Sequence, residues 1–247
     1  MCLVVLAYKV HPKYPLIVAA NRDEFLDRPT KPLHFWEDAH TILAGRDERA
    51  GGTWMGLTTA GRFAALTNYR DMRRQEVQGP SRGALVQRVL EQELGNWDTS
   101  PYAGFNLLHG HFDSLFYHSN VTGLHAALEP GIHGLSNHLL NTPWPKVQRA
   151  KDGLTEVIAS GEPSMEQLFE ILEDDTQALD HALPDTGIGL PWERALSSIH
   201  IRTDGYGTRC STIILVDAFG NARFTERSYF PEGERVHTLS VPVEATG

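Results

Sequence analysis

Cysteine is scarce in this chain of 247 residues, with only Cys2 and Cys210 present. Two cysteines argue against a disulfide scaffold and fit a reducing compartment. Basic residues are also few: 22 lysines and arginines stand against 31 acidic residues, so the net charge is -9. This balance argues against nucleic-acid binding, and the clustered Arg70, Arg73 and Arg74 are expected to form a solvated turn.

Long apolar runs are missing as well. The first apolar stretch, residues 2–8, is interrupted by Lys9 and followed by prolines, so it is neither a secretory signal nor a membrane span. We therefore expect a soluble, cytoplasmic protein. Apolar segments are spread evenly along the chain without repeats, which predicts a single domain over residues 1–247.

Strand patterns occur at both ends of the chain and helical patterns in the middle. Predicted strands cover residues 2–8, 16–21, 41–45, 53–58, 62–68, 105–109, 114–118, 197–201, 208–216 and 222–225. Predicted helices lie between Ser81 and Gly95, with Leu94 on the apolar face, and over residues 144–158 and 165–172. This order predicts an α+β fold, a four-layer αββα sandwich of antiparallel sheets. A two-layer α+β domain is the alternative, but the apolar run 211–216 favours four layers because it reads as buried on both faces.

Cys2 is the residue with the most specific chemistry, because it directly follows Met1. If Met1 is removed, Cys2 carries a thiol and a free α-amine, with reference pKa values of about 8.5 and about 7.7 to 8.0. The amine can then take the thiol proton, which is the N-terminal-nucleophile arrangement. A returning strand that ends in Asn21-Arg22-Asp23-Glu24 would bring Arg22 close enough to lower the thiol pKa. The alternatives are an inert strand cysteine and a retained Met1, which would block the amine.

Several motifs taken together resemble the NRDE family, that of transport and Golgi organisation protein 2. They are Asn21-Arg22-Asp23-Glu24, residues 51–56, residues 61–70, Ser81-Arg82-Gly83, residues 102–108, residues 134–137, residues 142–147 and Tyr206-Gly207-Thr208-Arg209. The resemblance spans nearly the whole chain. Two positions depart from the family pattern: Asn141, where aspartate is more frequent, and Cys210, where serine is more frequent.

The resemblance implies an N-terminal-nucleophile hydrolase-like fold and a role in intracellular haem trafficking. Lipid and acyl-CoA metabolism has also been proposed for the family, and no enzymatic activity is established for it. On this basis we expect a carrier of haem or another small amphipathic ligand, which exchanges it with donor or acceptor proteins and has no catalytic cofactor. Cys2, Trp54 and Tyr69 are the residues expected to contact haem. The alternative function is a Cys2-dependent amidohydrolase that cleaves C–N bonds.

The fold link to bile-salt hydrolases and penicillin V acylases supplies candidate residues for this alternative. Those enzymes also begin Met-Cys, but their arginine and aspartate lie three residues apart, whereas Arg22 and Asp23 are adjacent. Asn68 or Asn137 could donate to an oxyanion, and Arg209 could lie near the thiolate. The structural alternatives are that Asn68 caps a turn, Asn137 ends a loop and Arg209 pairs with Asp23.

Two other candidate sites are weaker. His109 and His111 lie at i and i+2 on a predicted strand, but no third ligand is suitably spaced, so no metal is expected. Four aromatic residues either line a pocket for a flat ligand or belong to the core: Trp36, Trp54, Tyr69 and Trp144.

Overall fold

A computed structural model describes residues 2–74, 77–92, 95 and 97–243, whose strands form two antiparallel sheets. The six-stranded sheet has the order β10-β1-β2-β11-β12-β13 and consists of β1 (Cys2–Tyr8), β2 (Leu16–Phe25), β10 (Gly131–Leu135), β11 (Tyr206–Val216), β12 (Asn221–Tyr229) and β13 (Glu232–Ser240). The seven-stranded sheet follows chain order and consists of β3 (Thr30–Phe35), β4 (Ile42–Asp47), β5 (Met55–Thr58), β6 (Arg62–Asn68), β7 (Phe105–His111), β8 (Ser114–Ser119) and β9 (Leu124–Ala127).

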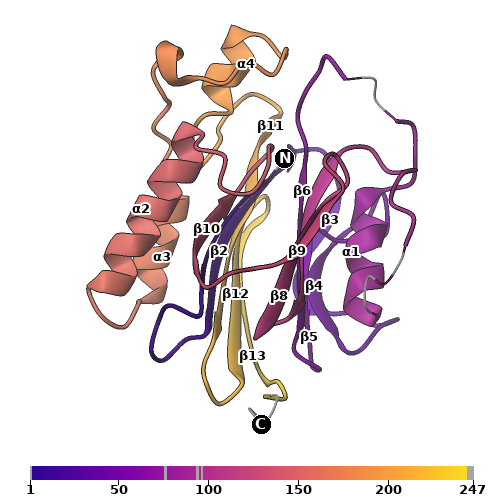
Figure 1. Cartoon of the computed structure of the whole chain (residues 1–247), viewed down its shortest axis with the longest axis vertical. Coiled ribbons are helices and arrows are strands. Elements are labelled where there is room, and N and C mark those ends of the chain that lie inside the picture. Colours follow the sequence, from indigo (N-terminus) through magenta and orange to yellow (C-terminus); the bar gives the residue numbers. More distant parts are fainter. Residues whose placement is uncertain (1, 75–76, 93–94, 96, 244–247) are drawn as a thin grey trace.

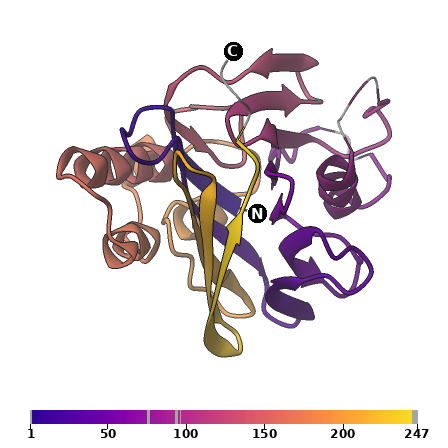
Figure 2. The same ribbon diagram turned by 90° about the horizontal axis from the view of Figure 1, so that it is seen from below.

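Helices cover the outer face of each sheet, so the layers run helix, sheet, sheet, helix (Figure 1). Helices α2 (Pro145–Ala159) and α3 (Met165–Leu172) pack on the six-stranded sheet, and α1 (Arg82–Glu91) packs on the seven-stranded sheet. Figure 2 shows the same order from below, with α2 and α3 on one side of the two sheets and α1 on the other. The predicted four-layer αββα sandwich is confirmed.

The period of two along each central strand divides the core into layers. In β1, Val4 and Leu6 pack between the sheets, whereas Leu3 and Val5 pack against α2 and α3. Strand β11 is buried along its whole length, as the apolar run 211–216 predicted. A third apolar cluster lies between α1 and the seven-stranded sheet.

The predicted helices are confirmed in place and type. The first ends at Glu91, and Leu94 lies outside the described residues. A further short helix, α4 (Leu190–Ala195), and a 3-10 turn at Asp180–Ala182 were not predicted; both lie between α3 and β11. Among the described helices, none has the length and apolar character that crossing a membrane requires.

Three strand predictions need correction. The strand predicted over residues 222–225 is longer and extends over Asn221–Tyr229 as β12. Residues 197–201 do not form a strand, because their amides bond to separate partners: His200 N–H donates to the Asp174 carbonyl and Ile201 N–H donates to Thr208 Oγ1. Strand β2 does not end at Asn21 but continues to Phe25. The polar signature therefore lies inside a central strand, where Asn21 and Arg22 pair with both β1 and β11, and Asp23 and Glu24 pair with β11.

The four unpredicted strands are the edge strands of the two sheets: β3, β9, β10 and β13. An edge strand has a neighbour on one side only and buries less apolar surface. β9 is exposed at every residue, and β3 contains Pro32, which an edge strand with an irregular register accommodates. Neither strand therefore shows the apolar alternation by which the inner strands were predicted.

Asn21, the first residue of the signature, ties β2 to the helical layer. Its Nδ2 donates to the carbonyls of Leu172 and Ile199 at 2.8 and 2.9 Å, and its Oδ1 accepts from Ser211 Oγ at 2.6 Å. Because the side chain is 1% exposed, no water replaces these bonds in a truncated variant.

We expect Asn21→Ala to lower the free energy of unfolding by about 2 to 4 kcal/mol, since each buried polar group left unpaired costs about 1 to 3 kcal/mol. Urea denaturation measures the change. The control is Asn221→Ala, whose exposed side chain bonds to Asp217 and whose loss should cost less than about 0.5 kcal/mol. Equal effects of the two substitutions would contradict this role of Asn21.

Candidate functional site

Cys2, Arg22 and Cys210 form a row across β1, β2 and β11. Cys2 lies opposite Arg22 in the pairing of β1 with β2, and Cys210 lies opposite Arg22 in the pairing of β11 with β2. Directly paired residues project from the same face of a sheet. Val4 is two residues from Cys2 on β1, and Ala20 is two residues from Arg22 on β2, so each pair shares a face of the sheet. Because Val4 and Ala20 face the seven-stranded sheet, the row also lies between the two sheets, at the end of the core. Two strand spacings, about 10 Å, separate the Cα atoms of Cys2 and Cys210, which is too far for a disulfide.

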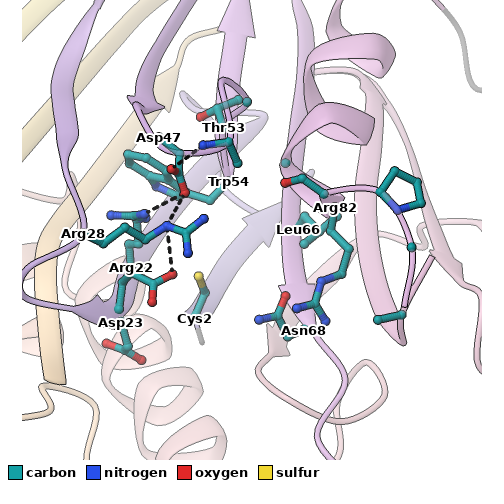
Figure 3. Close-up of a pocket in the computed structure, with 18 of the residues that line it drawn as sticks. Cys2, Arg22, Asp23, Arg28, Asp47, Thr53, Trp54, Leu66, Asn68 and Arg82 are labelled. Atoms are coloured by element: carbon teal, nitrogen blue, oxygen red, sulfur yellow. Dashed lines mark hydrogen bonds and ion pairs between the residues drawn. The ribbon is translucent and has the colours of Figure 1, made fainter. Parts of the chain in front are cut away.

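A cavity of about 750 Å³ lies beside this row. Its walls come from β1, β2, the connection after β4, the end of β6 and the start of α1. The charged residues of the walls are Arg22, Asp23, Glu24, Arg28, Asp47 and Arg82. Figure 3 shows Cys2 on one side of the cavity, with Asn68 and Arg82 on the facing wall. The cavity is therefore a polar site with a thiol in its wall.

The guanidinium of Arg22 is held on three sides. Its central carbon lies 4.2 Å from the ring centroid of Trp54, and Nη1 donates to Thr30 Oγ1 at 3.0 Å. Nη2 lies 3.5 Å from the Asp47 carboxylate, which also accepts a 2.6 Å hydrogen bond from Arg28. These contacts compensate the charge of Arg22 and fix it beside the thiol.

The two cysteine residues differ in overall exposure: Cys2 is partly exposed and Cys210 is buried. Burial raises the pKa of both, and raises that of Cys210 well above its usual value. At Cys2, the Asp23 carboxylate also raises the pKa, whereas Arg22 and a hydrogen bond from the Asp23 main-chain N–H lower it. The expectation that Arg22 brings the Cys2 pKa below its usual value is therefore wrong, because the loss of water around the sulfur outweighs the nearby cation.

Asp23 belongs to the opposite face of β2. In Figure 3 its side chain turns away from Arg22, and its Oδ1 accepts a 2.7 Å hydrogen bond from Thr208 Oγ1. Burial raises the pKa of Asp23, and Lys146 is the largest influence that lowers it. Cys2, Arg22 and Asp23 nevertheless all line the cavity, as expected from their positions on a hairpin.

The two asparagines considered as oxyanion donors have different surroundings. Asn68 ends β6 and lines the cavity. Asn137 is fully buried, where its Nδ2 donates to the Asn68 carbonyl at 3.0 Å and its own carbonyl accepts the Arg70 N–H. Asn137 therefore fixes the strand end that presents Asn68.

Arg209 and Tyr69 are anchored elsewhere. The Arg209 guanidinium donates to the main-chain carbonyls of Phe25, Leu26 and Phe230, and it lines a separate pocket of about 70 Å³ beside Cys210. The Tyr69 hydroxyl bonds to Nε2 of His138 at 2.9 Å. Of the residues expected to contact haem, Cys2 and Trp54 share the cavity.

The remaining histidine and tryptophan candidates belong to packed regions. His109 stacks on Phe116 and His125, and burial, with a smaller contribution from His125, lowers its pKa to about 4. Over the described part of the chain, no group of three or more potential ligands could hold a metal ion. Trp36 is fully buried in the core.

Arg70 corrects the expectation of a solvated arginine turn. It is buried, forms a 2.9 Å ion pair with Glu193 and lies over the ring of Trp144. Arg73 and Arg74 are exposed, as expected. The arginine cluster therefore spans the boundary between a buried charge network and the surface.

The sequence profile of one family, Transport and Golgi organisation 2, matches residues 1–231. The chain belongs to this family. It is 35% identical over 257 residues to the Transport and Golgi organization 2 homolog of Mus musculus and to the corresponding protein of Homo sapiens, with 92% of this chain and 93% of each relative covered.

Among solved structures, a bacterial enzyme resembles this chain in fold. It is the C2A mutant of the conjugated bile acid hydrolase from Clostridium perfringens, with a TM-score of 0.52, 8% identity and complete coverage of both chains. At that identity the likeness is one of fold. It agrees with the N-terminal-nucleophile hydrolase-like architecture that the family resemblance implied.

Four charged wall residues were not predicted as site residues: Glu24, Arg28, Asp47 and Arg82. Arg82 lies in the Ser81-Arg82-Gly83 motif, whose sequence indicates a helix start and the family but no role in a site. Arg28 follows the signature residue Glu24 by four positions and forms an ion pair with it at 3.8 Å. Asp47 has no sequence link to the signature, because only the packing of β3 and β4 beside β2 brings it to Arg22.

We expect Arg22→Met to slow alkylation of Cys2 by iodoacetamide at pH 7.5 by about threefold to tenfold, because loss of the cation lowers the thiolate fraction. Peptide mass spectrometry measures the rate. Arg46→Met is a matched control, since Arg46 lies over Trp36 at 4.1 Å in the same kind of stack away from the cavity. An unchanged rate in Arg22→Met, or an equal loss in Arg46→Met, would contradict the assignment.

Proposed function

We propose that this protein is a hydrolase that uses the Cys2 thiol to cleave the C–N bond of an amide. The observation that carries the proposal is the position of Cys2 in the wall of a polar cavity, facing Asn68 and Arg82. A thiol that attacks a carbonyl needs a donor for the developing oxyanion. The Asn68 side-chain amide is such a donor, and strands rather than mobile loops carry both groups.

The proposed reaction consumes one amide and one water. The Cys2 thiol gives its proton to a base, the sulfur attacks the carbonyl carbon, and Asn68 donates to the oxyanion. The intermediate collapses with cleavage of the C–N bond, the amine leaves with the proton from the base, and the acyl group stays on sulfur as a thioester. Water then attacks the thioester, which releases the carboxylic acid and restores the thiol.

The base in this scheme is the α-amine of Cys2 after removal of Met1. Its reference pKa of about 7.7 to 8.0 suits proton exchange with a thiol near neutral pH. The bile acid hydrolase of similar fold supports the proposal in one respect: the substitution C2A means that its unaltered chain also has cysteine at position 2.

Protein whose chain starts at Cys2 should hydrolyse N-acyl p-nitroanilides. Cys2→Ala should remove at least about 99% of this activity because the nucleophile is lost. Release of nitroaniline and intact mass are measured on the same samples. Cys210→Ser is the matched control and should retain activity, while a chain with one residue before Cys2 should stay folded and inactive. Hydrolysis by Cys2→Ala at the unsubstituted rate would refute the proposal.

A second candidate function, reversible haem binding, is favoured by Cys2 and Trp54 in one cavity. A cysteine thiolate is an axial ligand for ferric haem, and an indole offers a flat apolar face. Arg22, Arg28 and Arg82 carry charges complementary to propionates. The many charged groups in the walls suit an apolar macrocycle less well, which is why this candidate stands second.

Titration of the purified protein with haemin should give a saturable, shifted Soret band with micromolar affinity if the cavity binds haem. Cys2→Ala should then move the band because the axial ligand changes. Cys210→Ser should leave it in place. An unshifted band on haemin addition would exclude this function, and a shifted band unaffected by Cys2→Ala would exclude Cys2 as the ligand.

A further inference from the structure

A cluster of buried charges lies behind Cys2, on the helical side of β2. Its members are Asp23, Arg70, Lys146 and Glu193, which are between 1% and 6% exposed. Arg70 and Glu193 form an ion pair, and Thr186 donates to Glu193 through its N–H and its hydroxyl. The proposed reaction gives no role to Lys146.

Lys146 lies at the start of α2, which packs against β1 and β10 on the side of the sheet that Asp23 faces. It follows Pro145, the first residue of the helix, and is 1% exposed. Its Nζ makes no hydrogen bond with any residue that the structure describes. A buried ammonium without a hydrogen bond is costly, so its charge depends on the field of nearby carboxylates.

The charges that act on Lys146 come from β1, β2, α4 and the segment after β6. Burial lowers the pKa of Lys146 to about 8, and Asp23 on β2 is the largest influence that raises it. Cys2 on β1 and Glu193 on α4 also raise it, whereas Arg70 after β6 lowers it.

A further titratable neighbour of Asp23 and Arg70, Tyr206 on β11, stays neutral. Burial raises its pKa above its ordinary value, and Asp23 adds to this effect. The charge state of the cluster therefore depends on its acids and bases rather than on this phenol.

Asp23 depends on Lys146 in return. Burial favours the protonated carboxyl, and Lys146 does more than Thr208 or Arg22 to oppose it. Asp23 also touches the thiol site, because its main-chain N–H bonds to the Cys2 sulfur and its side chain lines the cavity.

We propose that Lys146 is a positioning residue that holds Asp23 in its ionised form behind Cys2. The ionised carboxylate is then available to an ammonium group at the thiol, either the α-ammonium of Cys2 or a protonated leaving amine. This use of the carboxylate rests on the proposed function, whereas the coupling between Lys146 and Asp23 does not.

The test is a ¹³C NMR titration of the full chain, labelled at aspartate carboxyl carbons and lysine Cε carbons. Lys146→Met should raise the Asp23 midpoint by at least about one pH unit, a tenfold change in proton affinity, so that ionised Asp23 is lost at higher pH on acidification. Asp23→Asn, which is nearly isosteric, should lower the Lys146 midpoint by a similar factor because coupling is reciprocal. Lys146→Arg keeps the charge and should preserve the Asp23 midpoint.

Lys151→Met is the matched control, because Lys151 lies on the same helix and its Nζ bonds to Asn141 at 3.2 Å. It should leave both midpoints unchanged. If the Lys146→Met variant does not fold, the Lys146 midpoint in the Asp23→Asn variant tests the coupling by itself. The inference is overturned if Lys146→Met leaves the Asp23 midpoint unchanged, or if Asp23→Asn leaves the Lys146 midpoint unchanged. These titrations need no hydrolysis, so a coupled pair in a protein without amidase activity would refute the proposed function and leave the inference standing.

Discussion

The position of β2 between β1 and β11 is the constraint on which the site depends. Side chains of a central strand alternate between two faces, and both faces of β2 are covered. The signature is divided accordingly: Asn21 and Asp23 face the helices, and Arg22 faces the cavity beside Cys2. A shift of one residue in register would exchange these faces and bury Arg22 among apolar helix residues.

The site is accordingly built from two sets of compensated charges on either side of one strand. The set in the cavity is Arg22, Arg28, Glu24 and Asp47, and the set on the helical side is Asp23, Lys146, Arg70 and Glu193. Buried charges of this kind contribute little net stability, but removing one partner leaves the other uncompensated. They therefore keep the thiol's surroundings in one electrostatic arrangement.

The central strands and the helices could be predicted because their burial leaves an apolar pattern in the sequence. The edge strands could not, since β9 is exposed and β3 contains Pro32. The end of β2 was placed too early for a related reason: four consecutive polar residues do not read as a buried strand. Such local violations of the pattern are expected at functional sites.

Cys2, Arg22, Asp23 and Asn68 could be predicted for the cavity because strand pairing or a motif identified them. Asp47 and Lys146 could not, because they reach the signature through packing between segments far apart in the chain. The raised Cys2 pKa was missed for the same reason. Desolvation depends on the whole enclosure, whereas the nearby arginine is visible in the sequence.

The most direct test of Cys2 as a nucleophile is to trap the acyl group during turnover. Protein whose chain starts at Cys2 is mixed with excess N-acyl amide, the reaction is quenched in acid, and the peptides are mapped by mass spectrometry. The account predicts an acyl thioester on the Cys2 peptide that neutral hydroxylamine removes. Turnover with an unmodified Cys2 peptide, or with the acyl group on another residue, would contradict it.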